Sequence, residues 1–232
     1  MQLKKVTQPA RAARNRWYDD ACGTALALEL VGERWSLLIV RELMFGPRRF
    51  GELRKALTGI SANVLTQRLE GLEEAGILTR EKLPPPASVQ VYALTPWGYK
   101  SEAAIQELGR WAVQSHRHDT TLPLSAASLM LSFRTMIDRS RSGLVNRTLG
   151  FRLGDEGFLA LVDEAGIAIR RGDPEEADTI FISDPVSMAS VIYGGRPITD
   201  AEDAGALTIK GSRVLARLFV TLFPLPPKVG SA

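Results

Sequence analysis

The sequence predicts a mixed α+β fold in two parts, and three observations lead to this prediction. Up to about residue 118, apolar residues recur mostly at helical spacing, interrupted by a single predicted hairpin. From about residue 125, short alternating runs broken by glycines indicate strands. Between them lies "SHRHDTTLPLS", a polar segment with a proline, which is typical of a domain boundary. We therefore expect a basic arm over 1–16, one domain over 17–118 and a smaller α+β domain over 125–225.

Composition narrows the class of protein. The chain has 232 residues, of which 45% are hydrophobic, as in globular proteins that bury a core. No run approaches the ~18 apolar residues that a membrane helix needs, and the basic N-terminus lacks the apolar core of a secretory signal. The single cysteine excludes an intramolecular disulfide and suits a reducing compartment. We therefore predict a cytoplasmic protein with no membrane segment.

Charge is unevenly distributed along the chain. Residues 1–122 contain 17 Lys and Arg against 13 Asp and Glu, whereas the remainder contains 12 against 13. A basic half joined to a nearly neutral half indicates that the first half is the one that meets a polyanion.

Three helices are predicted before residue 58. The first covers about 17–31 and the second about 33–45, with Gly32 between them and Gly46-Pro47 ending the second. A short helix over 48–57 follows. Apolar residues repeat at helical spacing in each of them: Ala21, Leu26, Leu28 and Leu30, then Trp35, Leu38, Ile39 and Leu43, then Phe50, Leu53 and Leu57.

The next helix, which begins after the turn "TGI", has two different faces. Ser61 is a good N-cap because its hydroxyl can accept from a backbone N–H two or three residues further on, and Gly76 ends the helix. One side of the helix is apolar and consists of Leu65, Leu69 and Leu72. The opposite side can form hydrogen bonds and consists of Asn63, Thr66 and Gln67.

A hairpin and a long helix complete the first half. "ILTREKL" and "SVQVYALT" are predicted strands. Pro84, Pro85 and Pro86 belong at the hairpin tip, because proline cannot donate to a sheet ladder. Thr95-Pro96 then opens a helix with an apolar stripe made of Trp97, Ala104, Ile105, Leu108, Trp111 and Ala112.

This order of elements predicts a winged helix-turn-helix, in which the helix beginning at Ser61 enters the major groove of DNA. Asn and Gln can bond bidentately to adenine, Thr can contact the thymine methyl, and short side chains allow close approach. We predict base contacts from Ser61, Ala62, Asn63, Thr66 and Gln67, and phosphate contacts from Arg68, Arg80 and Lys82. The alternative is that this polar face is merely solvated.

Several motifs carry a family resemblance. They are Cys22, Gly-x-Arg-Trp at 32–35, Arg-Phe-x-Glu-Leu at 49–53, Gly-Ile-Ser at 59–61, Leu-Thr-x-Arg-Leu at 65–69, Leu-Glu-x-x-Gly at 72–76 and "VYALTPWG". Over about residues 20–115 the chain resembles the HxlR family of bacterial winged-helix regulators, which is related to MarR. Arg34 replaces the family's usual lysine, and Val91 removes a carboxylate from the wing. The resemblance implies a homodimer on double-stranded DNA, paired through the helix at 17–30 and the stripe at 97–112.

In the second half, helices alternate with strands. Residues 125–149 show helical spacing, and "GFRLGDEGFLALVDEAGIAIRRG" indicates strands joined in hairpins. "ADTIFISD" and "GALTIKGS" are further predicted strands. "PVSMASVIYGG" is a short helix with Pro185 in its first turn, and "RVLARLFVTLF" is a closing apolar helix.

Residues 125–225 resemble the sterol-carrier-protein fold in "GDPEEADTIFISD", in "VIYGGRPITDAEDAGALTIKGS" and in the closing helix. The resemblance implies an apolar cavity that binds an apolar small-molecule effector, lined by Met130, Phe133, Met188, Ile192, Leu215, Phe219 and Leu222. Two alternatives stay open: these residues form an ordinary core, or the domain serves only as a structural or dimerisation module. Because "SHRHDTTLPLS" is short, we expect the second half to pack on the helix that follows Thr95.

Catalysis is not indicated. No nucleophile–base arrangement or cofactor motif is present. The only histidines, His116 and His118, lie in "HRHD" of the polar segment; these residues could bind a metal, but residues two apart do not share a helix face, so a solvated segment is favoured. The leading hypothesis is a ligand-responsive transcriptional repressor that uses no cofactor. A second hypothesis is a thiol sensor in which Cys22 detects oxidants or electrophiles; against it, the apolar surroundings of Cys22 favour a buried structural cysteine. A third is a lipid carrier with a vestigial DNA-binding domain, which the intact polar helix face argues against.

Overall fold

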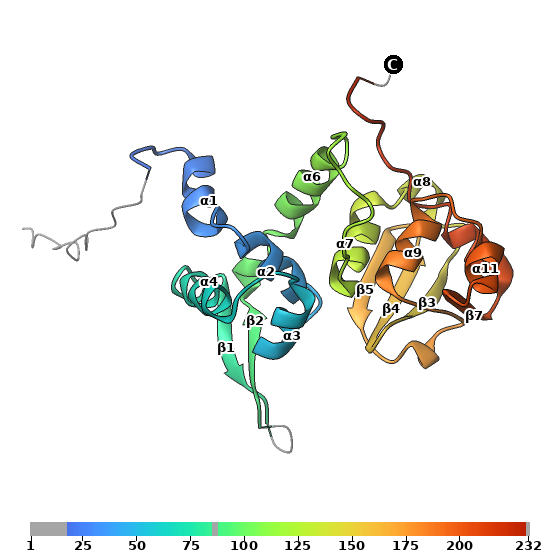
Figure 1. The fold of residues 1–232 in the computed structure, drawn as a ribbon, viewed down its shortest axis with the longest axis horizontal. Coiled ribbons are helices and arrows are strands. Elements are labelled where there is room, and N and C mark those ends of the chain that lie inside the picture. Colours follow the sequence, from blue (N-terminus) through green and yellow to red (C-terminus); the bar gives the residue numbers. More distant parts are fainter. Residues whose placement is uncertain (1–17, 85–87, 231–232) are drawn as a thin grey trace, which may run out of the picture.

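A computed structural model describes residues 18–84 and 88–230, with the two halves of the chain side by side (Figure 1). The predicted basic arm at 1–16, together with Pro85 and Pro86 of the predicted hairpin tip, lies outside the described residues. Within the described part, no helix is long and apolar enough to cross a membrane.

The first half contains the predicted helices and hairpin. Its elements are α1 (Gly23–Val31), α2 (Ser36–Leu43), α3 (Phe50–Ala56), α4 (Ala62–Glu74), β1 (Leu78–Lys82), β2 (Gln90–Leu94), α5 (Pro96–Tyr99) and α6 (Glu102–Ala112). Strands β1 and β2 pair antiparallel and project away from the helices as a ribbon (Figure 1). The winged helix-turn-helix order is therefore confirmed.

The predicted ends of α4 are confirmed. The Ser61 hydroxyl accepts a hydrogen bond from the backbone N–H of Val64 at 3.2 Å. At the other end Gly76 has φ +72°, a left-handed conformation that a residue with a Cβ adopts at a cost.

The predicted single helix after Thr95 is wrong, because it is interrupted between α5 and α6. The backbone N–H and the hydroxyl of Ser101 both donate to the carbonyl of Gly98, at 3.1 and 2.7 Å, and form a tight turn. Gly98 itself lies against the carbonyl of Ile77, where an added Cβ would come within 2.1 Å of the oxygen. The close approach of Gly98 to Ile77, just before the hairpin, thus fixes the chain near the break between α5 and α6.

The second half contains both helices and strands. Its elements are α7 (Ala126–Met136), α8 (Arg139–Ser142), β3 (Arg147–Leu153), β4 (Glu156–Asp163), β5 (Gly166–Arg171), the 3-10 turn η1 (Pro174–Glu176), β6 (Thr179–Ser183), α9 (Pro185–Ile192), α10 (Ile198–Asp203), β7 (Leu207–Gly211) and α11 (Arg213–Phe219). Residues 147–149 belong to β3, so the helical prediction for 125–149 extends too far.

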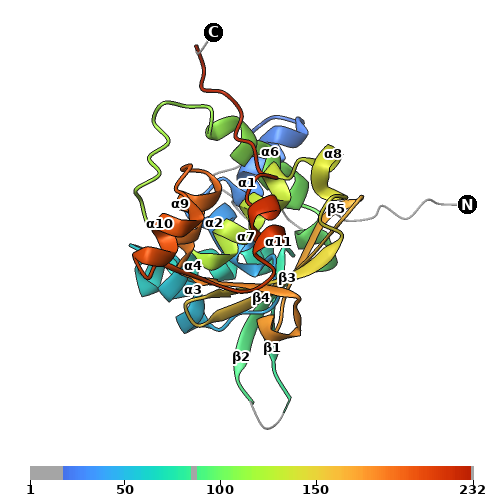
Figure 2. The same ribbon diagram turned by 90° about the vertical axis from the view of Figure 1, so that its right-hand side faces the viewer.

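The five strands form one sheet in the order β5-β4-β3-β6-β7. Only the β3–β6 pair is parallel, and the other three pairs are antiparallel. Helices α7, α9 and α11 lie on the same side of this sheet (Figure 2). Successive side chains of a strand point to opposite faces of a sheet. Phe151, Phe158 and Phe181 point to the face that the helices cover, and all three are fully buried.

Aromatic side chains fill the space between this sheet and its helices. Phe151 stacks on Phe181 with ring centroids 5.2 Å apart, and Phe219 of α11 meets both rings. Phe133 of α7 contacts Phe151, Phe219 and Phe223. The core of the second half is therefore built around a cluster of phenylalanines.

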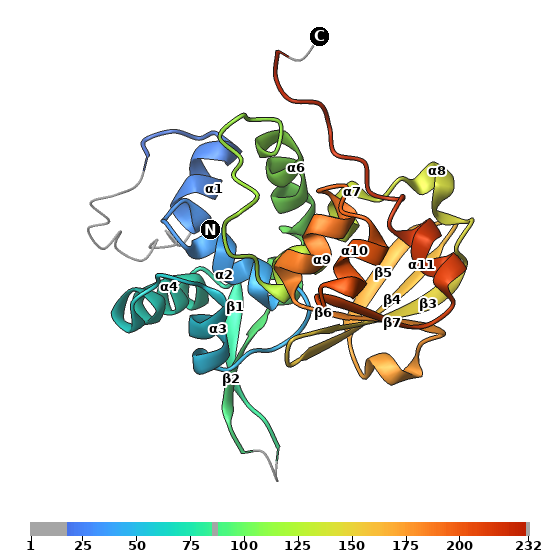
Figure 3. The same cartoon turned by 45° about the vertical axis from the view of Figure 1, so that its right-hand side comes forward.

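Helix α7 joins the two halves. Eight of its 11 residues are buried, and it packs against α6 and α2 on one side and against β5 on the other. A helix that is apolar nearly all round must be surrounded by protein, and Figure 3 shows α7 between the two halves. The expectation that the second half packs on the helix that follows Thr95 is confirmed for α6.

Arg134 of α7 connects elements of both halves. Its Nη1 donates to both carboxylate oxygens of Glu102 on α6, at 2.9 and 3.1 Å, and its Nη2 donates to the carbonyl of Ile169 on β5. Its guanidinium also lies 4.5 Å from the ring centroid of Phe45. Phe45 meets Phe158 of β4 edge to face, with centroids 5.7 Å apart, so the two halves share one apolar core.

The end of the chain returns to the first half. The Nζ of Lys228 donates to the carbonyls of Val113 and Ser115, at 2.8 and 3.1 Å, and the N–H of Val229 donates to Gln114. These carbonyls lie at the C-terminus of α6, where a positive charge is favourable. The tail therefore provides a second link between the halves.

Candidate DNA-binding surface

The outward face of α4 consists of polar side chains that are open to solvent. Asn63, Thr66 and Gln67 are exposed, as is Ser61 at the N-cap, and Ala62 is half-buried. The leucines of the same helix, Leu65, Leu69 and Leu72, are fully buried against the helices behind it. The structure thus brings the five predicted base-reading residues together on one exposed surface at the N-terminal part of α4.

Among the residues that the structure describes, none forms a hydrogen bond with the side chains of Asn63, Thr66 or Gln67. The Ser61 hydroxyl already accepts a hydrogen bond that caps α4, so Ser61 has a structural role in addition to its predicted contact with DNA. The N-terminus of a helix carries a partial positive charge from its free N–H groups, which favours the approach of a phosphate backbone. The face can therefore both read base edges and approach a polyanion.

Arg68 has a structural partner that sequence reasoning missed. Its Nε donates to the carbonyl of Arg34 at 3.0 Å, and its Nη2 lies 2.9 Å from the carboxylate of Glu33. These contacts tie α4 to the turn between α1 and α2. Arg68 is half-buried there, and its predicted contact with phosphate stays a prediction.

The wing presents the other two predicted phosphate ligands differently. Arg80 pairs with Glu73 at 3.1 Å and lies 5.5 Å from the ring centroid of Tyr92, so it is partly occupied by the fold. Lys82 lies at the outer end of β1, opposite Gln90, and is exposed. Lys82 is therefore the better placed of the two to meet a phosphate.

Cys22 lies at the N-cap of α1 and is exposed, so the structural, buried alternative is wrong. The helix that was expected to bury it begins only at Gly23. The backbone N–H groups of Thr24 and Ala25 lower the pKa of the Cys22 thiol, since they stabilise the thiolate. No regular spacing of apolar residues would have revealed this exposure.

Helices α1 and α6 present large apolar side chains to solvent. Trp111 is 72% exposed and Leu108 is 49% exposed on α6, and Leu26 and Leu28 are exposed on α1. Trp97 of α5 is exposed as well. We call these five residues the apolar face. Exposed apolar side chains of this size are candidates for contact with a partner.

The seven residues predicted to line an apolar cavity lie in the core of the second half. All except Leu215, which is half-buried, are buried, and Phe133 and Phe219 belong to the phenylalanine cluster. The cleft of about 900 Å³ that the described residues form lies between the halves and is lined by none of the seven. This placement favours the alternative that they are core; their role as ligand contacts stays a prediction.

Comparison with known proteins identifies the first half. A profile of the HxlR-like helix-turn-helix family matches residues 30–120. The HTH-type transcriptional regulator YodB of Bacillus subtilis is 40% identical over 88 residues, which cover 38% of this chain and 79% of YodB. The uncharacterized HTH-type transcriptional regulator Rv3095 of Mycobacterium tuberculosis is 47% identical over 85 residues, which cover 37% of this chain and 53% of that relative.

Solved structures are matched over the same region. The reduced form of YodB aligns with a TM-score of 0.39 at 36% identity, over 43% of this chain and 100% of the other. The oxidized form of the redox regulator HypR aligns with a TM-score of 0.39 at 26% identity, over 42% of this chain and 100% of the other. On the strength of its sequence relatives, the chain belongs to the HxlR-like helix-turn-helix family of transcriptional regulators.

Proposed function

We propose that the protein is a homodimeric, sequence-specific DNA-binding regulator that represses transcription by occupying promoter DNA. The observation that carries this proposal is the exposed face of α4, where Asn63, Thr66 and Gln67 have no place in the core. Side chains of this kind on a helix that fits the major groove are suited to reading base edges. Lys82 on the wing would add contacts to phosphate, which supply affinity without sequence information.

The apolar face supports the proposal that the protein dimerises. Burying Leu108 and Trp111 of α6 against the same residues of a second copy, with α1 packed alongside, would remove a large apolar area from water. A twofold dimer would present two copies of α4 to DNA, so we expect a palindromic site with half-sites about one helical turn apart.

The second half is the part we assign to regulation. Its strand–helix–strand order from β6 to α11 supports the sterol-carrier-like description, which we retain as a proposal. Its direct packing on α2 and α6 gives it a mechanical connection to the DNA-binding elements. The alternative hypothesis is that the second half is only a structural or dimerisation module. This alternative requires no ligand.

A thiol sensor is the second candidate function, and the exposure of Cys22 favours it. Thiolates are the reactive form of cysteine, and the lowered pKa of Cys22 increases the thiolate fraction at a given pH. Among the solved structures that this chain resembles, YodB has been seen with a bound quinone and the redox regulator HypR in an oxidized form.

Removing the predicted base contacts tests the main proposal. Asn63→Ala and Gln67→Ala should each weaken binding to the operator by roughly 1–3 kcal/mol and relax base preference, because a bidentate contact is lost. Lys82→Ala should instead weaken all sequences alike and reduce the dependence of affinity on salt. Competition binding against operator and unrelated duplexes at several salt concentrations measures both effects. Operator affinity equal to that of the parent protein in the Asn63 and Gln67 variants would show that α4 is not the reading helix.

The apolar face can be tested with a matched pair of leucines. Leu108→Glu on α6 should shift the protein to a monomer, because a charge would be buried in the dimer contact. Leu161→Glu on β4, where the parent side chain is 46% exposed, should leave the dimer intact. Sedimentation equilibrium distinguishes the two outcomes, and a dimeric Leu108→Glu variant would place the dimer contact elsewhere.

The thiol-sensor candidate predicts a titration. Because the pKa of Cys22 is lowered, its alkylation by iodoacetamide should rise with pH through a midpoint below that of a free thiol. Cys22→Ser should keep the DNA affinity of the reduced parent. Release of DNA by peroxide or a quinone from the parent, and not from Cys22→Ser, would make Cys22 the sensor. Equal behaviour of the two proteins would eliminate it.

A further inference from the structure

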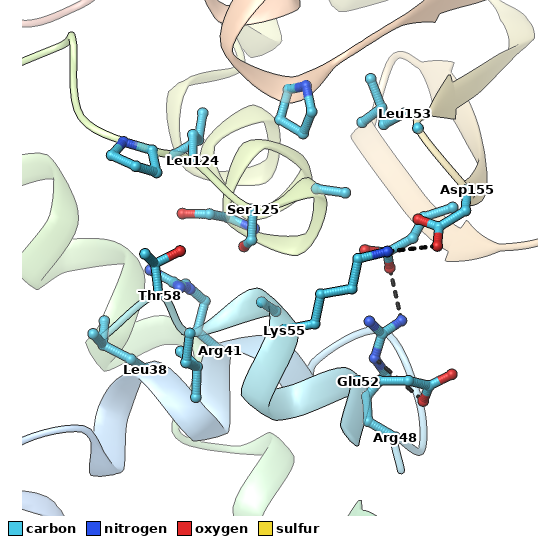
Figure 4. Close-up of a pocket in the computed structure, with 18 of the residues that line it drawn as sticks. Leu38, Arg41, Arg48, Glu52, Lys55, Thr58, Leu124, Ser125, Leu153 and Asp155 are labelled. Carbon is cyan, nitrogen blue, oxygen red and sulfur yellow. Dashed lines mark hydrogen bonds and ion pairs between the residues drawn. The ribbon is translucent and has the colours of Figure 1, made fainter. Parts of the chain in front are cut away.

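The two halves enclose a cleft of about 900 Å³ whose walls come from both of them. Helices α2 and α3 form one wall, and the N-terminus of α7 with the turn between β3 and β4 forms the other (Figure 4). Charged side chains gather at one end, where Lys55 reaches across to Asp155. Leu38, Thr58 and Leu124 lie at the other end, together with Arg41 (Figure 4).

At the charged end, two arginines depend on one carboxylate. Arg48, which precedes α3, and Arg171, at the end of β5, both donate to the same oxygen of Glu156; the Nη1 of Arg48 does so at 2.7 Å. Within the described residues, the Nε of Arg48 and the Nε and Nη2 of Arg171 are buried and have no acceptor. Leaving a buried donor without an acceptor is destabilising, more so when the group is charged.

The other charges around the cleft do not fill this need. Lys55 and Asp155 pair with each other, and Glu52 stays 3.7 Å from the Nε of Arg48. Arg41 is bound to the buried carboxylate of Glu42, which also accepts from Ser125 at 2.6 Å. At the charged end the ionic lining residues balance, with Arg48, Lys55 and Arg171 against Glu52, Asp155 and Glu156. What the charged end lacks is therefore an acceptor for the buried donors of Arg48 and Arg171, which an anion would supply.

The guanidinium groups and the apolar end of the cleft together select the kind of anion. Arginine offers its N–H donors as a planar fork that matches the two oxygens of a carboxylate. Burial lowers the pKa of Arg171, so its charged form gains from a second negative partner. The apolar end can take a hydrocarbon body against Leu38, Leu57 and Leu124.

We propose that this cleft binds a small organic acid, with its carboxylate at Arg48 and Arg171 and its apolar body between α2 and the start of α7. The site is distinct from the core of the second half, and it takes an amphipathic anion in place of a neutral apolar molecule. The effector site of the regulator would then be the junction between the two halves, which residues far apart in the sequence form together.

A ligand here would act on the DNA-binding elements directly. The backbone N–H of Arg48 donates to the carbonyl of Tyr92 at 2.9 Å, and the N–H of Tyr92 donates back at 2.8 Å, so Arg48 is fastened to the wing strand β2. Helix α3, which follows Arg48, forms the wall of the cleft. A molecule that contacts both walls changes DNA affinity to the extent that it prefers one spacing of them. This regulatory part of the inference rests on the proposed function.

The binding part can be tested without DNA, using the full chain. The probes are naphthalene-2-carboxylate and decanoate, each compared with its primary amide by titration calorimetry. Each acid should bind at least about tenfold more tightly than its amide, because charge-assisted hydrogen bonds form only with the acid. If neither acid binds better than its amide, the proposal is overturned.

Two substitutions locate the bound acid. Thr58→Trp fills the cleft from an exposed position and should weaken the binding of the acids at least about tenfold, whereas Thr208→Trp, exposed on β7, should leave it unchanged. Arg171→Met should remove the preference for acid over amide, with circular dichroism confirming that the variant is folded. Acid binding that survives Thr58→Trp, or that Thr208→Trp also weakens, would place the site elsewhere.

Regulation is measured last, in the same proteins. A bound acid should change operator affinity of the parent by the same factor by which operator changes the affinity for the acid, and Thr58→Trp should lose this effect while keeping basal DNA binding. Acid binding without any effect on DNA overturns the effector role alone. If the parent protein shows no specific DNA binding in the absence of acid, the proposed function is overturned, but the calorimetric result for acid binding is unaffected.

Discussion

The position of Arg134 on α7 is the constraint on which the arrangement of the molecule depends. One guanidinium contacts Glu102 of α6, the carbonyl of Ile169 within β5 and the ring of Phe45, which follows α2. Around it, α7 is buried on most sides, so neither half has a complete core without this helix. Removing α7 from its place would expose apolar surface on both sides of the junction. The halves are therefore best regarded as one packed body with a DNA-binding end.

This arrangement explains how a surface far from DNA can matter to it. The polar face of α4, which we propose reads DNA, is supported by the leucines beneath it and by the bond from Arg68 to the α1–α2 turn. The wing is tied to Arg48, and Arg48 is tied to Glu156 of the second half. A displacement at β4 can thus reach the wing through two directly bonded residues, and packed elements of this kind respond by discrete shifts.

The sequence was informative where structure is local. The helix over 62–74, its cap at Ser61 and its polar face follow from spacing within a few residues, and all three are found in the structure. The junction was not predictable in this way, because Arg48 and Glu156 are 108 positions apart and Lys55 and Asp155 are 100 apart. Periodicity likewise identified the apolar residues of the second half but could not show that they pack together tightly, nor that Cys22 stands outside the core.

All four tryptophans of the chain, Trp17, Trp35, Trp97 and Trp111, lie in the first half, so tryptophan emission reports the unfolding of that half alone. Phe158→Ala, in the second half, removes the partner of Phe45 and should cost about 3–5 kcal/mol. Urea unfolding of this variant, followed by tryptophan emission and by far-ultraviolet circular dichroism, tests the single packed body most directly. We predict one transition at lower urea, coincident for both signals. A tryptophan transition that stays at the position of the parent, while circular dichroism separates into two steps, would show that the halves are independent.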